Sequence, residues 1–204
     1  MEIYFIRHGK TKGNSEQRYV GRTDEPILES SKEELKKLDI PALDKLYVSP
    51  MIRCIETSKC IYPHMEYTIV EAFREMNFGD FEGKTYNELK ELPEFHAWYN
   101  SRGQIAITNG ESLLSFQKRV VEGLEPILQD CYEKGYKKVG FVVHGGTIMA
   151  LLDHYSHPHK NYQSWDSENG GGYAGVVEKM EDKFIITSLK RFGQEKNMLD
   201  AIKI

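Results

Sequence analysis

Short apolar runs alternate with helix-like segments along this chain, and that alternation restricts its fold more than any other feature of the sequence. Residues 3–6, 46–48 and 139–143 form such runs. Runs that are apolar on both faces are typical of buried strands in a mostly parallel sheet. Helical patterns follow the second and third runs, at 52–61 and 147–155. This order predicts an α/β fold in which helices cover the sheet.

The longest predicted helix begins near Glu111 and ends before Gly135. Apolar residues at helical spacing predict one buried face on it, formed by Leu114, Val121, Leu124, Leu128 and Cys131. Pro126 lies inside this segment. We expect it to kink the helix or split it in two, because proline removes a backbone hydrogen bond.

Two further segments complete the expected organisation. Residues 173–180 and 184–189 are rich in β-forming residues and predict a hairpin. The stretch 76–110 is polar, carries scattered aromatic residues and shows no strand pattern, so we predict a small lobe inserted over the sheet edge. A chain of 204 residues is expected to form a single domain, 1–204.

The charge balance argues against nucleic-acid and membrane partners. Lys and Arg total 27 against 31 Asp and Glu, which gives a formal net charge of −4. A mildly acidic chain binds polyanions poorly, and no apolar run approaches the roughly 18 residues that span a bilayer. No signal-peptide pattern precedes the first apolar run. We therefore expect a cytoplasmic protein, and the composition leaves its oligomeric state open.

Two of the apolar runs end in the same pattern, a histidine followed by glycine. Arg7-His8-Gly9 follows the first run, and His144-Gly145-Gly146 follows the run at 139–143. The carboxyl ends of strands line the ligand crevice in open α/β sheets, so the two histidines should meet there if their strands are neighbours. Glycine lets backbone N–H groups face an anion, and the start of a helix adds a positive end.

Arginine side chains complete a pocket that suits a phosphoryl group. Arg7 precedes the first histidine, and Arg53 lies one helical turn after the strand end at Ser49-Pro50. Arginine binds phosphate oxygens bidentately and stays charged. The sequence shows no serine nucleophile elbow and no well-placed cysteine. A histidine can be the nucleophile when one ring nitrogen is free and the other donates to a backbone carbonyl.

Each of these residues also has a plain structural explanation when it is considered alone. A histidine after a strand can be a turn residue, Arg53 can be a solvated helix arginine, Glu75 a surface carboxylate and Asn14 a loop cap. Their joint placement at strand ends is what indicates a site.

Four ordered blocks between residues 2 and 150 resemble the histidine phosphatase superfamily, also called phosphoglycerate mutase-like. They are Arg7-His8-Gly9-Lys10-Thr11-x-x-Asn14 with Arg18-Tyr19-x-Gly21-Arg22-Thr23-Asp24-x-Pro26, then Ser49-Pro50-x-x-Arg53-x-x-x-Thr57, Glu75-x-x-Phe78-Gly79-x-Phe81-Glu82-Gly83 and Val142-Val143-His144-Gly145-Gly146. Residues 18–26 are most similar to the α-ribazole phosphatase or broad-specificity phosphatase branch. The segment 28–38 departs from that branch, because Glu29-Ser30-Ser31-Lys32-Glu33-Glu34 stands where a Gly and a Gln-Ala are usual.

The resemblance implies a three-layer α/β/α sandwich and a role for each site residue. His8 would attack phosphorus and become a phosphohistidine, while Arg7, Arg53 and His144 would hold the phosphoryl oxygens. Glu75 would be the general acid and then the base that activates water. The substrate-binding set would be Asn14, Gly145, Thr11 and Gly21. The scheme requires no metal and no other cofactor.

The function implied is a metal-independent phosphomonoesterase, a hydrolase of a small-molecule phosphomonoester such as α-ribazole 5′-phosphate. One alternative is phosphoryl transfer of the phosphoglycerate mutase type, although those mutases are generally longer and differ in the block at 78–83. Another is a binding module that has lost its chemistry, although the five catalytic residues are all present.

Two clusters stay open at this point. His154, His157 and His159 could bind a metal, but they are more simply a polar loop that ends at Pro158. Aromatic residues in the lobe and in a later loop could be core or could contact a leaving group: Phe95, Trp98, Tyr99, Tyr162 and Trp165.

Overall fold

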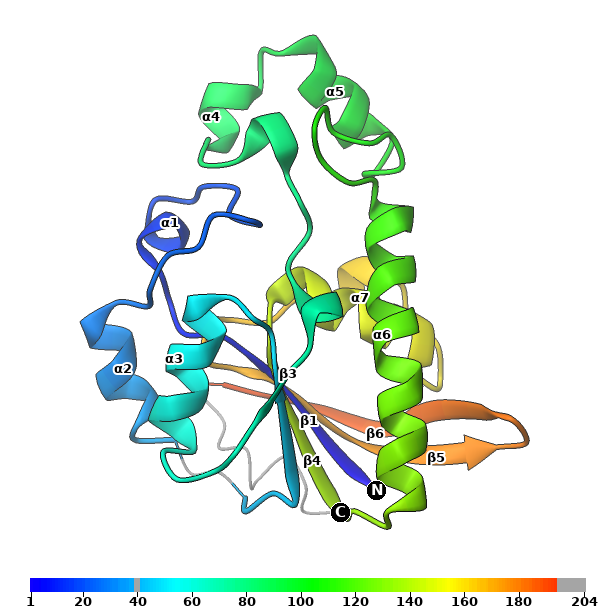
Figure 1. Ribbon diagram of the computed structural model, residues 1–204. Helices are drawn as coiled ribbons and strands as arrows, with labels where there is room; N and C mark the ends of the chain where they lie inside the picture. Colours follow the sequence, from blue (N-terminus) through cyan, green and yellow to red (C-terminus); the bar gives the residue numbers. More distant parts are fainter. Residues whose placement is uncertain (39–40, 194–204) are drawn as a thin grey trace.

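A six-stranded sheet runs through the centre of the computed structural model, which describes residues 1–38 and 41–193 (Figure 1). Its strand order is β3-β2-β4-β1-β5-β6. The first four strands in this order are parallel to one another, and β5 pairs antiparallel with both β1 and β6, so the predicted mostly parallel sheet is confirmed. The strands are β1 (Glu2–Arg7), β2 (Lys45–Val48), β3 (Thr68–Ile69), β4 (Lys138–Val143), β5 (Gly172–Met180) and β6 (Lys183–Phe192).

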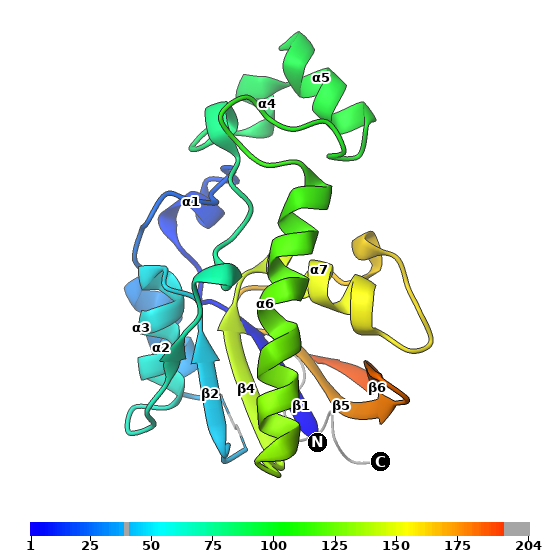
Figure 2. The same ribbon diagram turned by 45° about the vertical axis from the view of Figure 1, so that its right-hand side comes forward.

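Helices cover both faces of the sheet and give the three layers that the resemblance implies (Figures 1 and 2). Side chains along β1 alternate between the two faces. Ile3 and Phe5 pack with α6 (Leu113–Glu133) and α7 (Gly145–Tyr155). Tyr4 and Ile6 point to the other face, where α2 (Glu29–Leu35) and α3 (Ile52–Ile61) lie. All four of these β1 side chains are fully buried. A strand that is apolar at every position therefore serves two cores at once.

The predicted helix bounds differ from the observed ones in two details. Helix α3 has the predicted bounds, whereas α7 starts two residues before the predicted 147 because His144 is its N-cap. Helix α6 continues as one element through Pro126, so of the two expected effects, a kink or a split, the split is wrong. Pro126 and Glu122, whose carbonyl loses its partner, are both exposed. Water can therefore satisfy the freed carbonyl while the opposite face stays packed.

The buried face of α6 is also rotated from the predicted one. Leu114 is 71% exposed, which contradicts its predicted place in the core, and Val121 is only partly buried. The face that packs on the sheet consists of Phe116, Val120, Leu124, Leu128 and Cys131. Spacings of four separate most of these residues, whereas the predicted set relied on a heptad step from Leu114.

The stretch 76–110 forms the predicted lobe, which lies above the carboxyl ends of the strands (Figure 1). It contains the 3₁₀ turn η2 (Gly79–Phe81), α4 (Tyr86–Leu89) and α5 (Pro93–Asn100), and no strand is assigned within it. Phe81, Leu89, Phe95 and Ile107 are buried in its interior. The lobe thus has apolar packing of its own, which joins the core on the α6 side of the sheet.

The remaining elements are short. They are α1 (Lys12–Ser15) and the 3₁₀ turns η1 (Glu71–Phe73) and η3 (Tyr162–Ser164). The predicted hairpin is confirmed as β5 and β6, which pair in antiparallel register around Glu181 and Asp182. None of the helices in residues 1–38 and 41–193 has the length and apolar character required to cross a membrane.

Candidate active site

The parallel pairing of β1 and β4 brings the two predicted histidines together. Arg7 is in register with Val143, so His8 and His144 leave their strands side by side. The His8 N–H extends the ladder by donating to the Val143 carbonyl at 3.0 Å. The two imidazole rings lie 5.2 Å apart, centroid to centroid, edge to face. The sheet itself therefore sets the distance between them.

His8 is held as a neutral imidazole with one ring nitrogen committed to the backbone. Its Nδ1–H donates to the Gly9 carbonyl at 2.7 Å, because a carbonyl can only accept. That tautomer leaves the lone pair on Nε2. Burial lowers the pKa of His8 well below its ordinary value, and the nearby charges of Arg53 and Arg7 lower it further. The result is the protonation state that a histidine nucleophile needs.

His144 is fixed between two partners at the end of β4. Its Nδ1 accepts from Arg53 Nε at 3.2 Å, so its Nε2–H donates to the Ser49 hydroxyl at 2.7 Å. Burial lowers the pKa of His144 well below its ordinary value, with Arg53 as the next cause. Ser49 follows β2, so three neighbouring strands contribute to this group.

Arg53 is 1% exposed and ties α3 to the loop that follows α1. Its Nη1 donates to the Thr23 carbonyl and its Nη2 to the Gly21 carbonyl, both at 2.8 Å. Thr57, one turn later, accepts from the Gly9 N–H at 2.8 Å and donates to the Arg53 carbonyl at 2.7 Å. This helix therefore positions a charge beside both imidazoles and also fixes the backbone next to His8.

Arg7 has a buried donor that no group in the described part of the chain satisfies. Its Nη1 donates to the Ser167 carbonyl, but its Nε has no hydrogen-bond partner within residues 1–38 and 41–193. Burial lowers the pKa of Arg7, and the charge of Glu75 opposes that shift. A buried, unpaired N–H is costly, and active sites hold such groups ready for an anionic ligand.

Glu75 is the buried carboxyl of the site, 8% exposed, in the chain after η1. Its Oε1 accepts from the Met76 N–H and its Oε2 from the Gly146 N–H, both at 2.9 Å. Burial raises the pKa of Glu75, although these N–H groups and the two arginines act against the rise. A raised pKa suits a group that must carry a proton at neutral pH.

The glycine pair that begins α7 leaves room for two of the predicted catalytic side chains, Arg7 and Glu75. A Cβ atom on Gly145 would lie 3.3 Å from the guanidinium carbon of Arg7. One on Gly146 would lie 2.5 Å from Glu75 Oε1, closer than real Cβ contacts allow. The predicted function of these glycines was to expose backbone N–H groups. The structure adds that Glu75 occupies the space that a Gly146 side chain would fill, and that a side chain at Gly145 would make a tight contact with Arg7.

Thr11 and Asn14 form a reciprocal cap on α1 beside His8. The Thr11 hydroxyl accepts from the Asn14 N–H, and Asn14 Oδ1 accepts from the Thr11 N–H, both at 3.2 Å. Asn169 Nδ2 donates to the same Oδ1 and to the His8 carbonyl, each at 3.1 Å. With its oxygen committed, Asn14 presents its amide N–H₂ as a donor. Sequence reasoning missed Asn169, whose only local signal is its place before Gly170-Gly171-Gly172.

The backbone N–H and carbonyl of Gly21 both form hydrogen bonds within the protein. Its N–H donates to Glu82 Oε1 at 3.0 Å, and its carbonyl accepts from Arg53. A Cβ on Gly21 would lie 1.8 Å from the Met76 carbonyl oxygen, so two loops cross closely there. Glu82 also accepts from the Arg22 N–H at 2.7 Å and from the Thr23 hydroxyl at 2.9 Å. The predicted substrate contact of Gly21 stays a prediction, and its structural role is this crossing.

A cavity of about 1350 Å³ borders the buried carboxyl, with both Glu75 and Gly146 in its wall. Most of the other lining residues come from the lobe, from the first turns of α6, from α7 and from η3, and Tyr19 comes from the loop after α1. Trp98, Tyr99 and Tyr162 line it, together with Tyr19 and Phe78. Phe95 and Trp165 are buried instead. The aromatic residues that the sequence left open thus divide into core and cavity wall.

The histidines near the end of α7 do not form a metal cluster in the part of the chain that the structure describes. There, no group of three or more His, Cys, Asp or Glu side chains could hold an ion. His159 Nε2 lies 3.5 Å from Asp153 Oδ1, and the other carboxylate oxygen of Asp153 accepts from Gln117 Nε2 at 2.8 Å.

Known proteins share both the sequence pattern and the fold. The sequence profile of the histidine phosphatase superfamily (branch 1) matches residues 3–188. The uncharacterized phosphatase PhoE of Bacillus subtilis is 29% identical over 161 residues, which cover 76% of this chain and 77% of that protein. A broad-specificity phosphatase of Saccharomyces cerevisiae is 26% identical over 164 residues, 74% of this chain and 69% of that one.

A solved structure extends the likeness to the whole architecture. The α-ribazole phosphatase of Shigella flexneri superposes with a TM-score of 0.77 at 21% identity, covering 97% of this chain and 98% of that one. At this identity the likeness shows the fold alone. The profile match covers most of the chain, and the predicted resemblance is confirmed: the protein belongs to the histidine phosphatase superfamily.

Proposed function

We propose that the protein is a phosphomonoesterase that hydrolyses a small phosphorylated metabolite through a phosphohistidine on His8. One observation carries the proposal: a neutral imidazole and a carboxyl of raised pKa are buried in the same site. A neutral imidazole is the form that a nucleophile requires, and a raised pKa favours the proton that a general acid must carry. The profile match to a family of phosphatases supports the same chemistry.

In the first step, the Nε2 lone pair of His8 forms a bond to phosphorus as the bond from phosphorus to the ester oxygen breaks. The electron pair of the broken bond stays on that oxygen, which takes the proton of Glu75. In the second step, water attacks phosphorus and gives its proton to the Glu75 carboxylate. The P–N bond breaks, its electron pair returns to Nε2, and inorganic phosphate leaves. The carboxyl is restored to its protonated form.

Fixed charges around His8 would stabilise the phosphoryl group as it transfers. Phosphoryl transfer depends mainly on positioning and electrostatics. The buried Nε–H of Arg7 and the amide of Asn14 are donors that a phosphoryl oxygen could accept from. The N–H of Gly145 lies in the first turn of α7, where the helix end is positive. Arg53 and His144 supply the remaining polar surroundings of His8.

The leaving group would occupy the cavity that Glu75 borders. Its aromatic wall and its polar side chains suit a group that combines a ring with hydroxyls, such as a ribosyl heterocycle. We therefore propose α-ribazole 5′-phosphate as a candidate substrate. Phosphoglycerate mutase-type transfer, in which the phosphoryl group returns to the substrate instead of passing to water, is the alternative.

The test is phosphate release from a panel of phosphomonoesters in EDTA. The panel holds α-ribazole 5′-phosphate, sugar phosphates, nucleotides and 3-phosphoglycerate, and the last is also followed for isomer exchange. We expect metal-free phosphate release, with the highest kcat/KM naming the substrate class. Isomer exchange without phosphate release would replace the hydrolase by a mutase. No phosphate release from any substrate in the panel would overturn the proposal.

Replacing Glu75 by glutamine should slow hydrolysis in proportion to how much the leaving group needs a proton. General acid catalysis contributes about 10²–10⁴-fold. We therefore expect a loss of about 10³-fold on an alkyl phosphate such as glycerol 2-phosphate, and of less than about 10-fold on p-nitrophenyl phosphate. Steady-state kcat/KM on both substrates measures the difference. An equal loss on both would remove the acid role from Glu75.

A further inference from the structure

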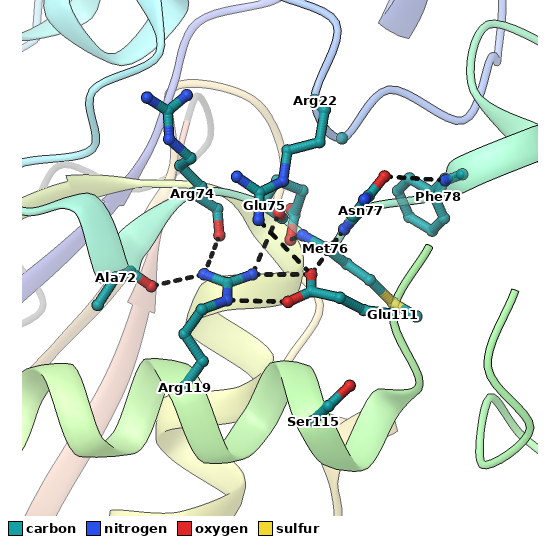
Figure 3. Close-up of polar contacts among 12 residues, drawn as sticks. Arg22, Ala72, Arg74, Glu75, Met76, Asn77, Phe78, Glu111, Ser115 and Arg119 are labelled. Atoms are coloured by element: carbon teal, nitrogen blue, oxygen red, sulfur yellow. Dashed lines mark hydrogen bonds and ion pairs between the residues drawn. The ribbon is translucent and has the colours of Figure 1, made fainter. Parts of the chain in front are cut away.

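The short segment that carries the proposed general acid, Glu75, lies outside every helix and strand. Glu75 follows the short turn η1, and residues 74–78 are irregular. Proton transfer requires the carboxyl to stay within hydrogen-bond reach of the leaving oxygen. Something outside this segment must therefore hold it in place. Figure 3 shows Arg119 of α6 and Glu111 lying against it.

Arg119 donates to three main-chain carbonyls in and just before this segment. Its Nη1 donates to the Ala72 carbonyl at 2.8 Å and to the Arg74 carbonyl at 3.1 Å. Its Nη2 reaches the carbonyl of Glu75 itself at 3.5 Å. The planar guanidinium can make these bonds together because its donors form a rigid fork.

Glu111 holds both Arg119 and the far side of the same segment. Its two carboxylate oxygens accept from Arg119 Nε at 2.9 Å and from Nη2 at 2.8 Å, a bidentate pair. Its Oε2 also accepts from the Asn77 N–H at 2.8 Å. The carbonyls before Glu75 and the amide after it are thus tied to one ion pair, which we call the Arg119–Glu111 pair (Figure 3).

The helix that supplies Arg119 is itself seated closely on η1. Gly123, one turn after Arg119, faces Ala72, and a Cβ on Gly123 would lie 2.4 Å from the Ala72 Cβ. The Arg119 guanidinium also lies over the Phe116 ring, 5.3 Å from its centroid. Phe116 is fully buried. The guanidinium therefore has a firm support on one side and the backbone of the acid segment on the other.

We infer that Arg119, oriented by Glu111, is the positioning residue for the proposed general acid. The inference rests on the proposed function, since it concerns the proton that Glu75 delivers. Arg119 does not line the cavity, and apart from its pair with Glu111 its hydrogen bonds within the described residues go to the main-chain carbonyls of Ala72, Arg74 and Glu75. A residue that served folding alone would affect all substrates equally. A positioning residue affects those that need the acid.

The experiment measures kcat/KM for Arg119→Ala, Arg119→Lys and Glu111→Gln on glycerol 2-phosphate and on p-nitrophenyl phosphate. Lys118→Ala is the matched control, because Lys118 is the exposed neighbour on the same helix and pairs only loosely with Glu122 at 3.8 Å. A misplacement of about 1 Å can cost about 10²-fold. We expect Arg119→Ala to lose about 10²-fold on glycerol 2-phosphate and less than about 5-fold on p-nitrophenyl phosphate.

The conservative variants keep the test valid if Arg119→Ala does not fold. Lysine keeps the charge but cannot form the fork, so Arg119→Lys should recover only part of the activity on the alkyl ester. Glu111→Gln should show the same preference for the good leaving group with a smaller loss. Equal losses on the two substrates, in any variant whose melting temperature matches the wild type, would overturn the inference.

A double-substitution cycle separates the inference from the proposed function. Phenyl phosphate is the substrate, because its leaving group needs the acid less than an alkoxide does and activity stays measurable. If Arg119 acts through the carboxyl, Arg119→Ala should change kcat/KM less than about 3-fold in the Glu75→Gln background. If Arg119→Ala lowers kcat/KM in the Glu75→Gln background as much as it does in the wild type, only the positioning role of Arg119 is overturned. If Glu75→Gln itself shows no leaving-group dependence, the proposed acid role fails instead.

Discussion

His8→Ala is expected to lower kcat by at least about 10⁴-fold on every phosphomonoester, whatever its leaving group, because loss of a nucleophile removes the whole covalent route. The imidazole is 4% exposed and neutral, and its Nδ1 is committed to Gly9. Alanine leaves no atom that could replace the Nε2 lone pair. Good leaving groups should not rescue the variant, in contrast to Glu75→Gln.

Two measurements test this expectation. Steady-state phosphate release gives kcat, and rapid quench with ³²P-labelled substrate traps the phosphoenzyme. A phosphohistidine is labile in acid and stable in base, so its pattern of stability identifies the residue type. The control is His64→Ala, since His64 is an exposed histidine in the loop after α3. A phosphoenzyme that forms in His8→Ala, or one that survives acid, would contradict the mechanism.

Arg7→Met should separate activity from stability. Methionine removes the buried Nε–H that has no partner in the described residues. Loss of one such preorganised donor costs about 10²–10³-fold in kcat. Burying a guanidinium is costly while no anion is bound, so we expect the ligand-free melting temperature to stay the same or rise. Strained active sites often trade stability for function in this way.

Thermal unfolding with and without inorganic phosphate checks the second half of this prediction. Ligand that binds only the folded state stabilises it as its concentration exceeds Kd. Phosphate should therefore raise the melting temperature of the wild type and have little effect on Arg7→Met. The control is Arg18→Met, since Arg18 is a partly exposed arginine that pairs with Glu16 at 2.6 Å. A variant that loses stability but keeps its response to phosphate would show that Arg7 is structural.

The fold could be predicted from the sequence where local pattern and burial agree. Residues 3–6 are apolar on both faces because β1 is central in the sheet, between β4 and β5. The same pattern fails at Leu114, which continues an apolar repeat yet is exposed beside the cavity. Helix α6 shows the converse, since Pro126 could split the helix in two and does not. Periodicity reports which residues could be buried, and tertiary packing decides which of them are.

The candidate site was predictable where residues follow strand ends. His8 and His144 stand at the ends of β1 and β4, so their meeting follows from strand order. Asn169 and Arg119 could not be found in this way. Asn169 binds the His8 carbonyl across 161 positions, and Arg119 binds the Glu75 carbonyl across 44. Neither has a local pattern, because each is selected by a backbone group that the fold brings to it.

Glycine is favoured in this protein for two different reasons, the backbone conformation at some positions and crowding by neighbouring atoms at others. Gly83 and Gly135 have φ values of +73° and +70° with nothing within 4 Å of an added Cβ, so the backbone alone requires glycine there. Gly145 and Gly146 are in a helix, where any residue fits the backbone, and it is the neighbouring side chains that favour glycine there, Glu75 at 2.5 Å from a Cβ on Gly146 and Arg7 at 3.3 Å from one on Gly145. The opening turn of α7 therefore limits the space available to both Arg7 and Glu75. An added methyl group would displace Glu75 or crowd Arg7, the proposed proton donor and the proposed anion-binding charge, while every hydrogen bond of the helix survived.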